Sequence, residues 1–144
     1  MNFKLRKAKR KDLKKIAKMY KEEYGRRPFN ERWTDKTSLK RINNYYKSSK
    51  IFVVEVEKNV VGALVLSDYI WFNGKRGHID EIFITKDFQG KGIGSKLIKF
   101  AEKYFSDKKI SGLTFISHKK SMAFKFYKKR GYKETGWVHM EKKL

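Results

Sequence analysis

The alternation of hydrophobic and polar residues along the first half of the chain predicts strands on either side of two helices. Period-two alternation over residues 3–7 and β-branched, apolar runs over 51–57 and 60–72 are typical of strands. Apolar residues recur at helical spacing over 13–25 and again around 39–46, so a helix is expected in each segment. Only a short turn separates the two longer strands, which should therefore form a hairpin.

The second half continues with strands and helices in alternation. We expect a strand over 77–84, a helix from about 94 to 106, a strand over 112–117, a helix over 120–130 and a terminal hairpin of strands 132–137 and 138–144. The resulting order, β-α-α-β-β-β-α-β-α-β-β, predicts an α+β fold around a central sheet.

A glycine-rich turn joins the predicted strand 77–84 to the helix that follows it. Gly90, Gly92 and Gly94 stand at alternate positions, which leaves several backbone N–H groups free to converge at the positive end of a helix dipole. Such a turn suits a pyrophosphate. The dinucleotide fingerprint GxGxxG is excluded because Ser95 stands where its last glycine would be, and the P-loop pattern GxxxxGK[ST] is absent.

The composition adds limits to this picture. With 144 residues, no cysteine and three scattered histidines, we expect a single domain over residues 1–144 without disulfides and without a metal site. No apolar run approaches the length of a membrane span, so we expect a cytoplasmic protein that does not associate with membranes.

The charge is unusual. A formal net charge of +22 attracts polyanions and repels small polycations. Two interpretations remain open: a lysine-rich solvated surface, or a face that associates with nucleic acid or another polyanion. In either case the positive charge would favour the binding of an anionic cofactor.

Two segments resemble motifs of the GNAT superfamily of N-acetyltransferases. Gln89-x-x-Gly92-x-Gly94 is similar to the family's coenzyme A pyrophosphate loop, [RQ]-x-x-G-x-[GA]. After it comes a match to the family pattern N-x-x-A-x-x-[FL]-Y-x-x-x-G-[FY], with these residues: Ala123, Phe126, Tyr127, Gly131 and Tyr132. Lys120 stands at the asparagine position of that pattern, so one cofactor contact is altered.

The resemblance implies a fold and a reaction. The fold would be a mixed, mostly antiparallel sheet flanked by helices, with one parallel pair of strands beside the cofactor. The reaction would be transfer of an acetyl group from acetyl-CoA, as cosubstrate, to a primary amine of a small molecule or a protein. The implied cofactor-binding residues are Ile82, Ile84, Gln89, Gly90, Lys91, Gly92, Ile93, Gly94, Ser95 and Tyr127.

The reaction needs a proton acceptor, because an alkyl ammonium has a pKa of about 10.4 and losing its proton at pH 7 costs roughly 4–5 kcal/mol. Some members of the family have a base in the strand before the glycine turn. The resemblance to them implies a base on the strand face shared by positions 78, 80, 82 and 84. That placement favours Asp80, with His78 second and Glu81, on the opposite face, third. The alternative for each is a solvated or edge side chain.

The resemblance also implies an oxyanion donor and a general acid. The donor would be the backbone N–H near Ile84, where a strand bulge would leave amides unpaired. The acid would be Tyr127, whose pKa the adjacent Lys128, Lys129 and Arg130 should lower. The alternative for Tyr127 is a core tyrosine on a helix face.

Other functions remain open. The chain could be a basic nucleic-acid-binding or regulatory protein on a GNAT scaffold, or a basic enzyme that acts on an acidic macromolecule. Exposed strand edges at the C-terminus favour a homodimer. The residues do not identify the acceptor amine.

Overall fold

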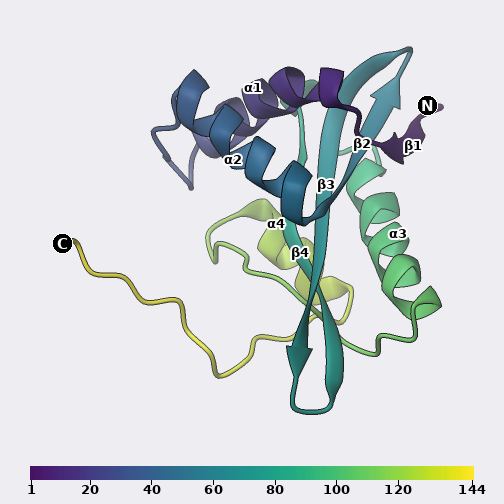
Figure 1. The fold of residues 1–144 in the computed structure, drawn as a ribbon, viewed down its shortest axis with the longest axis vertical. Coiled ribbons are helices and arrows are strands. Elements are labelled where there is room, and N and C mark those ends of the chain that lie inside the picture. The colour runs from purple at the N-terminus through teal and green to yellow at the C-terminus, as the bar shows by residue number, and fades with distance from the viewer.

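A five-stranded sheet lies at the centre of the computed structural model, which describes residues 1–144 (Figure 1). The strands follow one another in chain order: β1 (Lys4–Lys7), β2 (Lys50–Val56), β3 (Asn59–Trp71), β4 (Gly74–Ile84) and β5 (Leu113–Thr114). All neighbouring strands are antiparallel except β4 and β5, which are parallel. The mixed sheet with one parallel pair confirms the expected fold.

Four helices cover the sheet, two on each face. They are α1 (Leu13–Tyr24), α2 (Asp35–Ser48), α3 (Ile93–Asp107) and α4 (Met122–Lys129). The helices α1 and α2 lie together on one side and α3 and α4 on the other (Figure 1). Short 3-10 turns, η1 (Arg10–Asp12) and η2 (Lys86–Phe88), precede α1 and α3. None of the helices has both the length and the apolar character of a membrane span.

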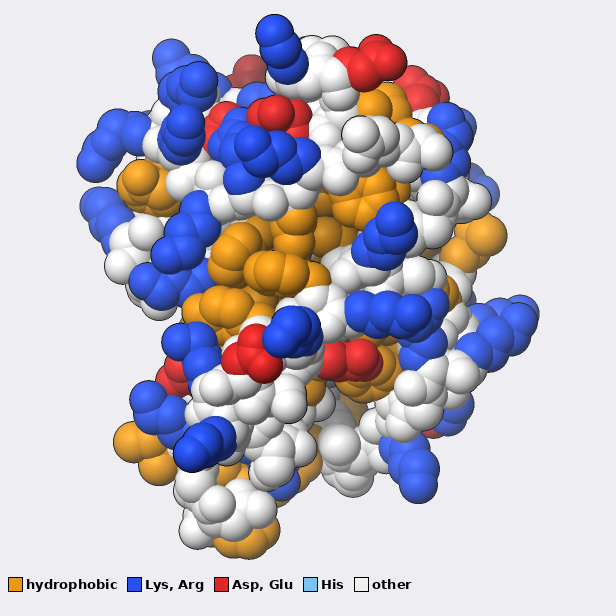
Figure 2. Space-filling model, turned by 90° about the vertical axis from the view of Figure 1, so that its right-hand side faces the viewer, with side chains coloured by type: hydrophobic (Ala, Val, Ile, Leu, Met, Phe, Trp, Pro, Cys, Tyr) orange, Lys and Arg blue, Asp and Glu red, His pale blue; other side chains and the backbone are white.

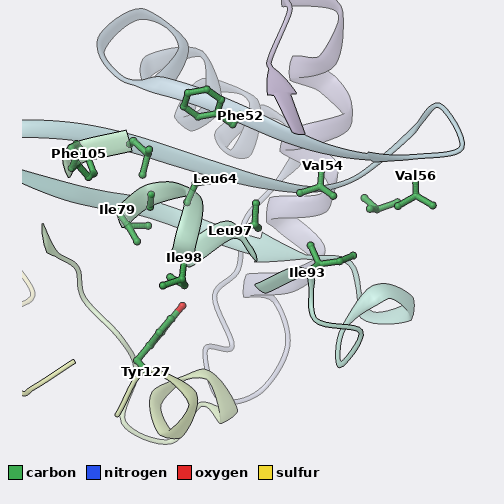
Figure 3. Packing of buried hydrophobic residues seen from close by; sticks show 13 residues of the cluster. Phe52, Val54, Val56, Leu64, Ile79, Ile93, Leu97, Ile98, Phe105 and Tyr127 are labelled. Atoms are coloured by element: carbon green, nitrogen blue, oxygen red, sulfur yellow. The ribbon is translucent and has the colours of Figure 1, made fainter. Parts of the chain in front are cut away.

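Each face of the sheet has its own hydrophobic cluster. On the α3 side, Leu97 and Ile98 are fully buried against Leu64 (Figure 3). Burial of an aliphatic side chain of this size contributes about 1.5–3 kcal/mol. Gly77 lets α3 approach β4 closely, because a Cβ at this position would lie 2.5 Å from the ring of Phe105.

A β-bulge in β4 changes which residues share a face. Val65 pairs with Glu81 and Leu66 pairs with Ile79, so Asp80 is an extra residue without a partner across the strand pair. Ile79 and Ile82 therefore both contact the cluster on the α3 side, although three positions separate them. The expectation that positions 78, 80, 82 and 84 share one face is wrong, because the bulge shifts the alternation by one residue.

The C-terminal part of the chain differs from the expectation. The strand expected over 112–117 is reduced to Leu113–Thr114, and no strand forms over 132–137 or 138–144. The expected terminal hairpin is therefore wrong. Alternation makes a strand only where a neighbour accepts its hydrogen bonds, and β5 is too short to offer a long edge. The chain end extends away from the sheet (Figure 1). Trp137 and Met140 are exposed. The homodimer expected from those strand edges stays a prediction without that support.

Candidate active site

The glycine turn between η2 and α3 has a backbone shape that few residues other than glycine adopt. Gly90 and Gly92 have φ angles of 72° and 82°, in the left-handed region. No backbone N–H from Gly90 to Ser95 donates a hydrogen bond within the chain, and no side chain caps the start of α3. These donors and the positive end of the helix dipole form a site for an anion.

Gln89 holds the turn against β4. Its side-chain Nε2 donates to the backbone oxygen of Ile84 at 2.7 Å and to Oε2 of Glu23 at 2.9 Å. The glutamine of the motif is therefore a brace for the turn. Next to it, Lys91 is exposed, and its ammonium lies 5.2 Å from the centre of the Phe88 ring.

Close to the glycine turn, one edge of β4 has no neighbouring strand. The N–H of Thr85 donates to the oxygen of Val61, and hydrogen bonding alternates along an antiparallel pair, so the N–H groups of Ile82 and Ile84 point away from β3. On that side β5 pairs only with Gly77 and His78. The amides near Ile84 are thus free because β4 and β5 separate. The expectation of a bulge at Ile84 is wrong, since the bulge is at Asp80.

Tyr127 lies on the buried face of α4 and its ring packs on Phe115, with 4.5 Å between ring centres. Its hydroxyl points from α4 toward Ile98 and the sheet (Figure 3). It forms no hydrogen bond within the chain. Burial raises the pKa of Tyr127 to about 12.

The expected lowering of the Tyr127 pKa is wrong. Lys128, Lys129 and Arg130 are exposed, on the side of α4 that faces solvent. Lys128 forms an ion pair with Glu134 at 3.3 Å. Because water screens these exposed charges, the loss of solvent around the phenol decides its pKa.

Glu81, the third candidate base, lies in a group of tyrosines on the other face of the sheet. It is 8% exposed. Its carboxylate accepts hydrogen bonds from the hydroxyls of Tyr24 at 2.6 Å, Tyr45 at 2.7 Å and Tyr20 at 3.3 Å, and Arg41 lies 3.5 Å away. Burial raises the pKa of Glu81, although the hydroxyls and Arg41 oppose the change.

The sequence reading missed the partners of Glu81. Tyr20 and Tyr24 are four residues apart on α1, and this spacing places both on one helix face. Tyr45 and Arg41 have the same spacing on α2. That two helix faces converge on one carboxylate became visible only in the fold.

The other two candidate bases have different surroundings. Asp80 is half-buried at the bulge, and its Oδ2 is buried without a hydrogen-bond partner. His78 uses Nδ1 in a 3.0 Å hydrogen bond with Oγ1 of Thr114, which also lies 3.1 Å from the hydroxyl of Tyr69. Asp80 is therefore the candidate with a buried acceptor oxygen that no group of the chain uses.

Four of the expected site residues come together on the α3 side of the sheet. Ile82, Ile84, Ile93 and Tyr127 all belong to or pack against the α3-side cluster, which joins the open edge of β4 to the start of α3 and to α4. Lys120, at the asparagine position of the second motif, is exposed in the turn before α4. No group of three or more His, Cys, Asp or Glu side chains could hold a metal ion, and the expectation of no metal stays a prediction.

An aromatic wall lies beside this region. The segment between α1 and α2 places Phe29 against Tyr24, with ring centres 5.1 Å apart, and against His118, 5.8 Å apart. Trp33 packs on Tyr20 at 5.0 Å. The wall connects α1 with the turn before α4, so it borders both Glu81 and the α4 side.

Comparison with known proteins places this geometry in a family. Residues 15–144 match the model of the acetyltransferase (GNAT) domain. An uncharacterized N-acetyltransferase of Methanocaldococcus jannaschii is 34% identical over 123 residues, which are 78% of this chain and 51% of the relative. The chain thus spans about half the length of that relative. An uncharacterized N-acetyltransferase of Archaeoglobus fulgidus is 33% identical over 110 residues, 69% of this chain and 71% of the relative.

Solved structures agree on the fold. A possible acetyltransferase from Clostridium difficile 630 superposes with a TM-score of 0.84 at 19% identity and covers 100% of this chain and 99% of its own. A predicted acetyltransferase with acetyl-CoA from Clostridium acetobutylicum gives a TM-score of 0.73 at 20% identity, over 97% of this chain and 96% of its own. The match over residues 15–144, with a glycine turn of unpaired amides beside an open strand edge, means that the chain belongs to the GNAT family of acetyltransferases.

Proposed function

We propose that the protein transfers an acetyl group from acetyl-CoA to a primary amine. The observation that carries the proposal is the run of unpaired N–H groups from Gly90 to Ser95 at the start of α3. No acceptor within the chain pairs with these donors, whereas a bound diphosphate would satisfy them. The structure from Clostridium acetobutylicum with acetyl-CoA supports this choice of ligand.

The residues present fit coenzyme A along its length. The turn from Gln89 to Ser95, with Lys91 beside it, would hold the diphosphate. The open edge of β4 at Ile82 and Ile84 would pair with the amides of the pantetheine arm, as a further strand would. Tyr127 would stand near the sulfur. The coenzyme supplies the activated thioester, and the protein supplies position, a proton acceptor and hydrogen-bond donors.

Asp80 is the proposed proton acceptor for the amine. Its buried Oδ2 has no partner, so it can accept the ammonium proton directly or through one water. His78 retains one free ring nitrogen and is the second candidate. Glu81 is the third, because its carboxylate already accepts bonds from Tyr20, Tyr24 and Tyr45.

The N–H of Ile84 is the proposed donor to the oxygen that becomes negative when the amine attacks the carbonyl. A backbone donor held on a strand needs no reorientation during the reaction, and one such donor contributes about 3–4 kcal/mol. The freedom of this N–H from β3 and β5 supports its assignment.

Tyr127 is the proposed partner of the leaving sulfur. Because its pKa is about 12 and that of a thiol is about 8.5, complete proton transfer would be uphill by about 5 kcal/mol. The hydroxyl therefore acts as a hydrogen-bond donor to the thiolate and keeps its proton at neutral pH. This role is weaker than that of a full acid, but it still favours departure of the sulfur.

The test is release of free thiol from acetyl-CoA with panels of small amines, aminoglycosides, polyamines and peptides. We expect one panel to give turnover and Asp80→Asn to lower kcat/KM about 100-fold. Asp68→Asn, an exposed carboxylate of β3 paired with Lys75, should leave turnover unchanged. Absence of acetyl-CoA binding by calorimetry would overturn the proposal. Full activity of Asp80→Asn would remove only the role of Asp80.

Association with a polyanion is a second candidate function, supported by the distribution of charge. Figure 2 shows lysine and arginine side chains over much of one face, around a central apolar area, with smaller groups of carboxylates among them. The formal net charge is +22. RNA binding that weakens steeply with salt, without thiol release from acetyl-CoA, would favour a binding role over the transferase.

A further inference from the structure

The hairpin of β3 and β4 continues beyond the part of the sheet that other strands support. β2 pairs with β3 only as far as Leu66, and β5 pairs with β4 only at Gly77 and His78. Residues 67–76 therefore form a two-stranded ribbon, which projects beyond the helices (Figure 1). None of the residues proposed for acetyl transfer lies in this segment.

The end of the ribbon carries two large apolar side chains in water. Ile70 is 83% exposed and Phe72, in the turn directly after β3, is 87% exposed. We call these two side chains the apolar tip. Neighbouring apolar side chains that are exposed at the end of a projecting element are typical of a surface that binds a protein or a membrane.

Three lysines lie behind the apolar tip, and we call them the lysine group: Lys75, Lys108 and Lys109. Together with Asp68 and Ile110 they line a hollow of about 400 Å³ between the hairpin and the end of α3. Lys75 lies directly across the strand pair from Ile70, so both side chains are on the same face of the hairpin. Lys75 is paired with Asp68 at 3.6 Å, but Lys108 and Lys109 take part in no ion pair. The surface behind the apolar tip is therefore positively charged.

The aromatic side chains of the hairpin do not form a free stacking surface for bases. Trp71 is half-buried, and the guanidinium of Arg76 lies 5.1 Å from the centre of its ring. Tyr69 is also half-buried, with its ring centre 6.1 Å from that of Trp71. Because Ile70 is aliphatic, only Phe72 offers an exposed ring to a base. Single-stranded nucleic acid is therefore a poor match for the apolar tip.

A second copy of this chain is a poor match for a different reason. Contact between the apolar tips of two copies would bring two lysine groups together, on proteins that each have a formal net charge of +22. An anionic lipid surface matches both features, because its acyl region accepts apolar side chains and its headgroups are negative.

We propose that the end of the β3–β4 hairpin docks the protein on an anionic lipid bilayer. Ile70 and Phe72 enter the boundary between headgroups and acyl chains, and the lysine group contacts the headgroup phosphates. Tyr69 and Trp71 then lie at the level of the headgroups, where such side chains are enriched. The expectation that the protein does not associate with membranes rested on the lack of a membrane-spanning run, which docking of this kind does not need.

The test is co-sedimentation of the protein with vesicles of phosphatidylcholine alone and with vesicles that contain about one-third phosphatidylglycerol. We expect at least about tenfold tighter binding to the anionic vesicles, and weaker binding as salt rises from about 0.1 M to about 0.5 M. The double variant Ile70→Ser, Phe72→Ser should bind the anionic vesicles at least about tenfold more weakly than the unaltered protein. We expect a loss of the same size in the triple variant of the lysine group, Lys75→Gln, Lys108→Gln, Lys109→Gln.

Matched variants separate the hairpin from general properties of the surface. Ile116→Ser with Met122→Ser removes two other apolar side chains, which are 77% and 92% exposed. Lys14→Gln, Lys15→Gln and Lys18→Gln together remove three positive charges from exposed positions of α1. Both controls should bind the anionic vesicles within about threefold of the unaltered protein. Because all the altered positions are exposed, circular dichroism should give the same unfolding temperature for every variant.

Failure to bind either kind of vesicle would overturn the inference, as would equal binding by the double variant of the apolar tip and its control. Two other results, each without vesicle binding, would also overturn it. A dimer in light scattering that Ile70→Ser, Phe72→Ser dissociates would make the apolar tip a contact between copies. Binding of single-stranded RNA that the triple variant of the lysine group abolishes would assign this surface to nucleic acid. None of these results bears on the transferase proposal, which depends on acetyl-CoA binding and thiol release.

Discussion

Two regions of the protein deal with negative charge in opposite ways. The glycine turn offers backbone N–H groups from Gly90 to Ser95 that have no partner within the chain. The group around Glu81, on the other face of the sheet, contains its own anion and already satisfies it with tyrosine hydroxyls and Arg41.

The difference shows which region contributes mainly to the stability of the fold and which contributes mainly to ligand binding. Groups that are satisfied within the chain stabilise the fold, whereas donors left unpaired at the surface are kept for a ligand. The Glu81 group should therefore matter most for unfolding, and the turn most for affinity. Tyr127, whose hydroxyl makes no hydrogen bond in the chain, should matter most for the rate of the reaction.

The largest effect is expected from Glu81→Ala. The variant leaves hydroxyls of Tyr20, Tyr24 and Tyr45 without their acceptor, so the free energy of unfolding should fall by about 3 kcal/mol. Urea unfolding followed by circular dichroism measures it. Glu22→Ala, at an exposed position of the same helix as Tyr24, is the control and should change stability by less than about 0.5 kcal/mol. Equal stability of the two variants would contradict the structural role of the group.

The next effect is expected from Tyr127→Phe. Loss of the hydroxyl should lower kcat about 100-fold, or about 2.7 kcal/mol, while acetyl-CoA affinity stays within about twofold. Thiol release and calorimetry measure the two quantities. Phe124→Leu, on the same helix but outside the buried face of Tyr127, is the control for packing of α4. A kcat near that of the unaltered protein would exclude the hydroxyl from the reaction.

A smaller effect is expected from Gly92→Ala. Gly92 has a φ of 82° and open space at the Cβ position, so the cost is that of the backbone conformation alone, about 1–2 kcal/mol. A turn that relaxes to avoid this strain loses its converging N–H groups, and acetyl-CoA affinity should fall about tenfold. Gly136→Ala, where a Cβ also meets nothing and φ is not in the left-handed region, should bind as before. Unchanged affinity of Gly92→Ala would place the ligand elsewhere.

The smallest effect is expected in how the free energy of unfolding depends on pH. The folded-state pKa of Glu81 is raised above its ordinary value of 4.5, so the folded protein holds this proton more tightly than the unfolded chain. The stabilisation is complete below pH 4.5 and is lost as pH rises through the folded-state pKa. Relative to Glu81→Gln, which mimics the protonated form at every pH, the unaltered protein should lose unfolding free energy over that interval. If the unaltered protein instead gained unfolding free energy relative to Glu81→Gln as pH rises, the raised pKa would be contradicted.

The elements whose pattern depends only on near neighbours were predictable. The helical stripe that begins at Leu13 and the apolar runs of β2 and β3 gave the right elements, because burial of one face dictates their periodicity. The terminal segments 132–137 and 138–144 were also expected to be strands, and they form none. A strand depends on a partner for its hydrogen bonds, and the alternation of a segment carries no information about its partner.

The candidate site divides in the same way. Glycines at fixed spacing, followed by a helical stripe, were enough to predict a turn of unpaired N–H groups, since glycine conformation and helix ends are local properties. The bulge at Asp80, the short β5 that frees Ile84, the burial that raises the pKa of Tyr127 and the tyrosines around Glu81 were decided only by the tertiary structure. These features depend on which distant segments meet, and on how much solvent they exclude from a group when they do.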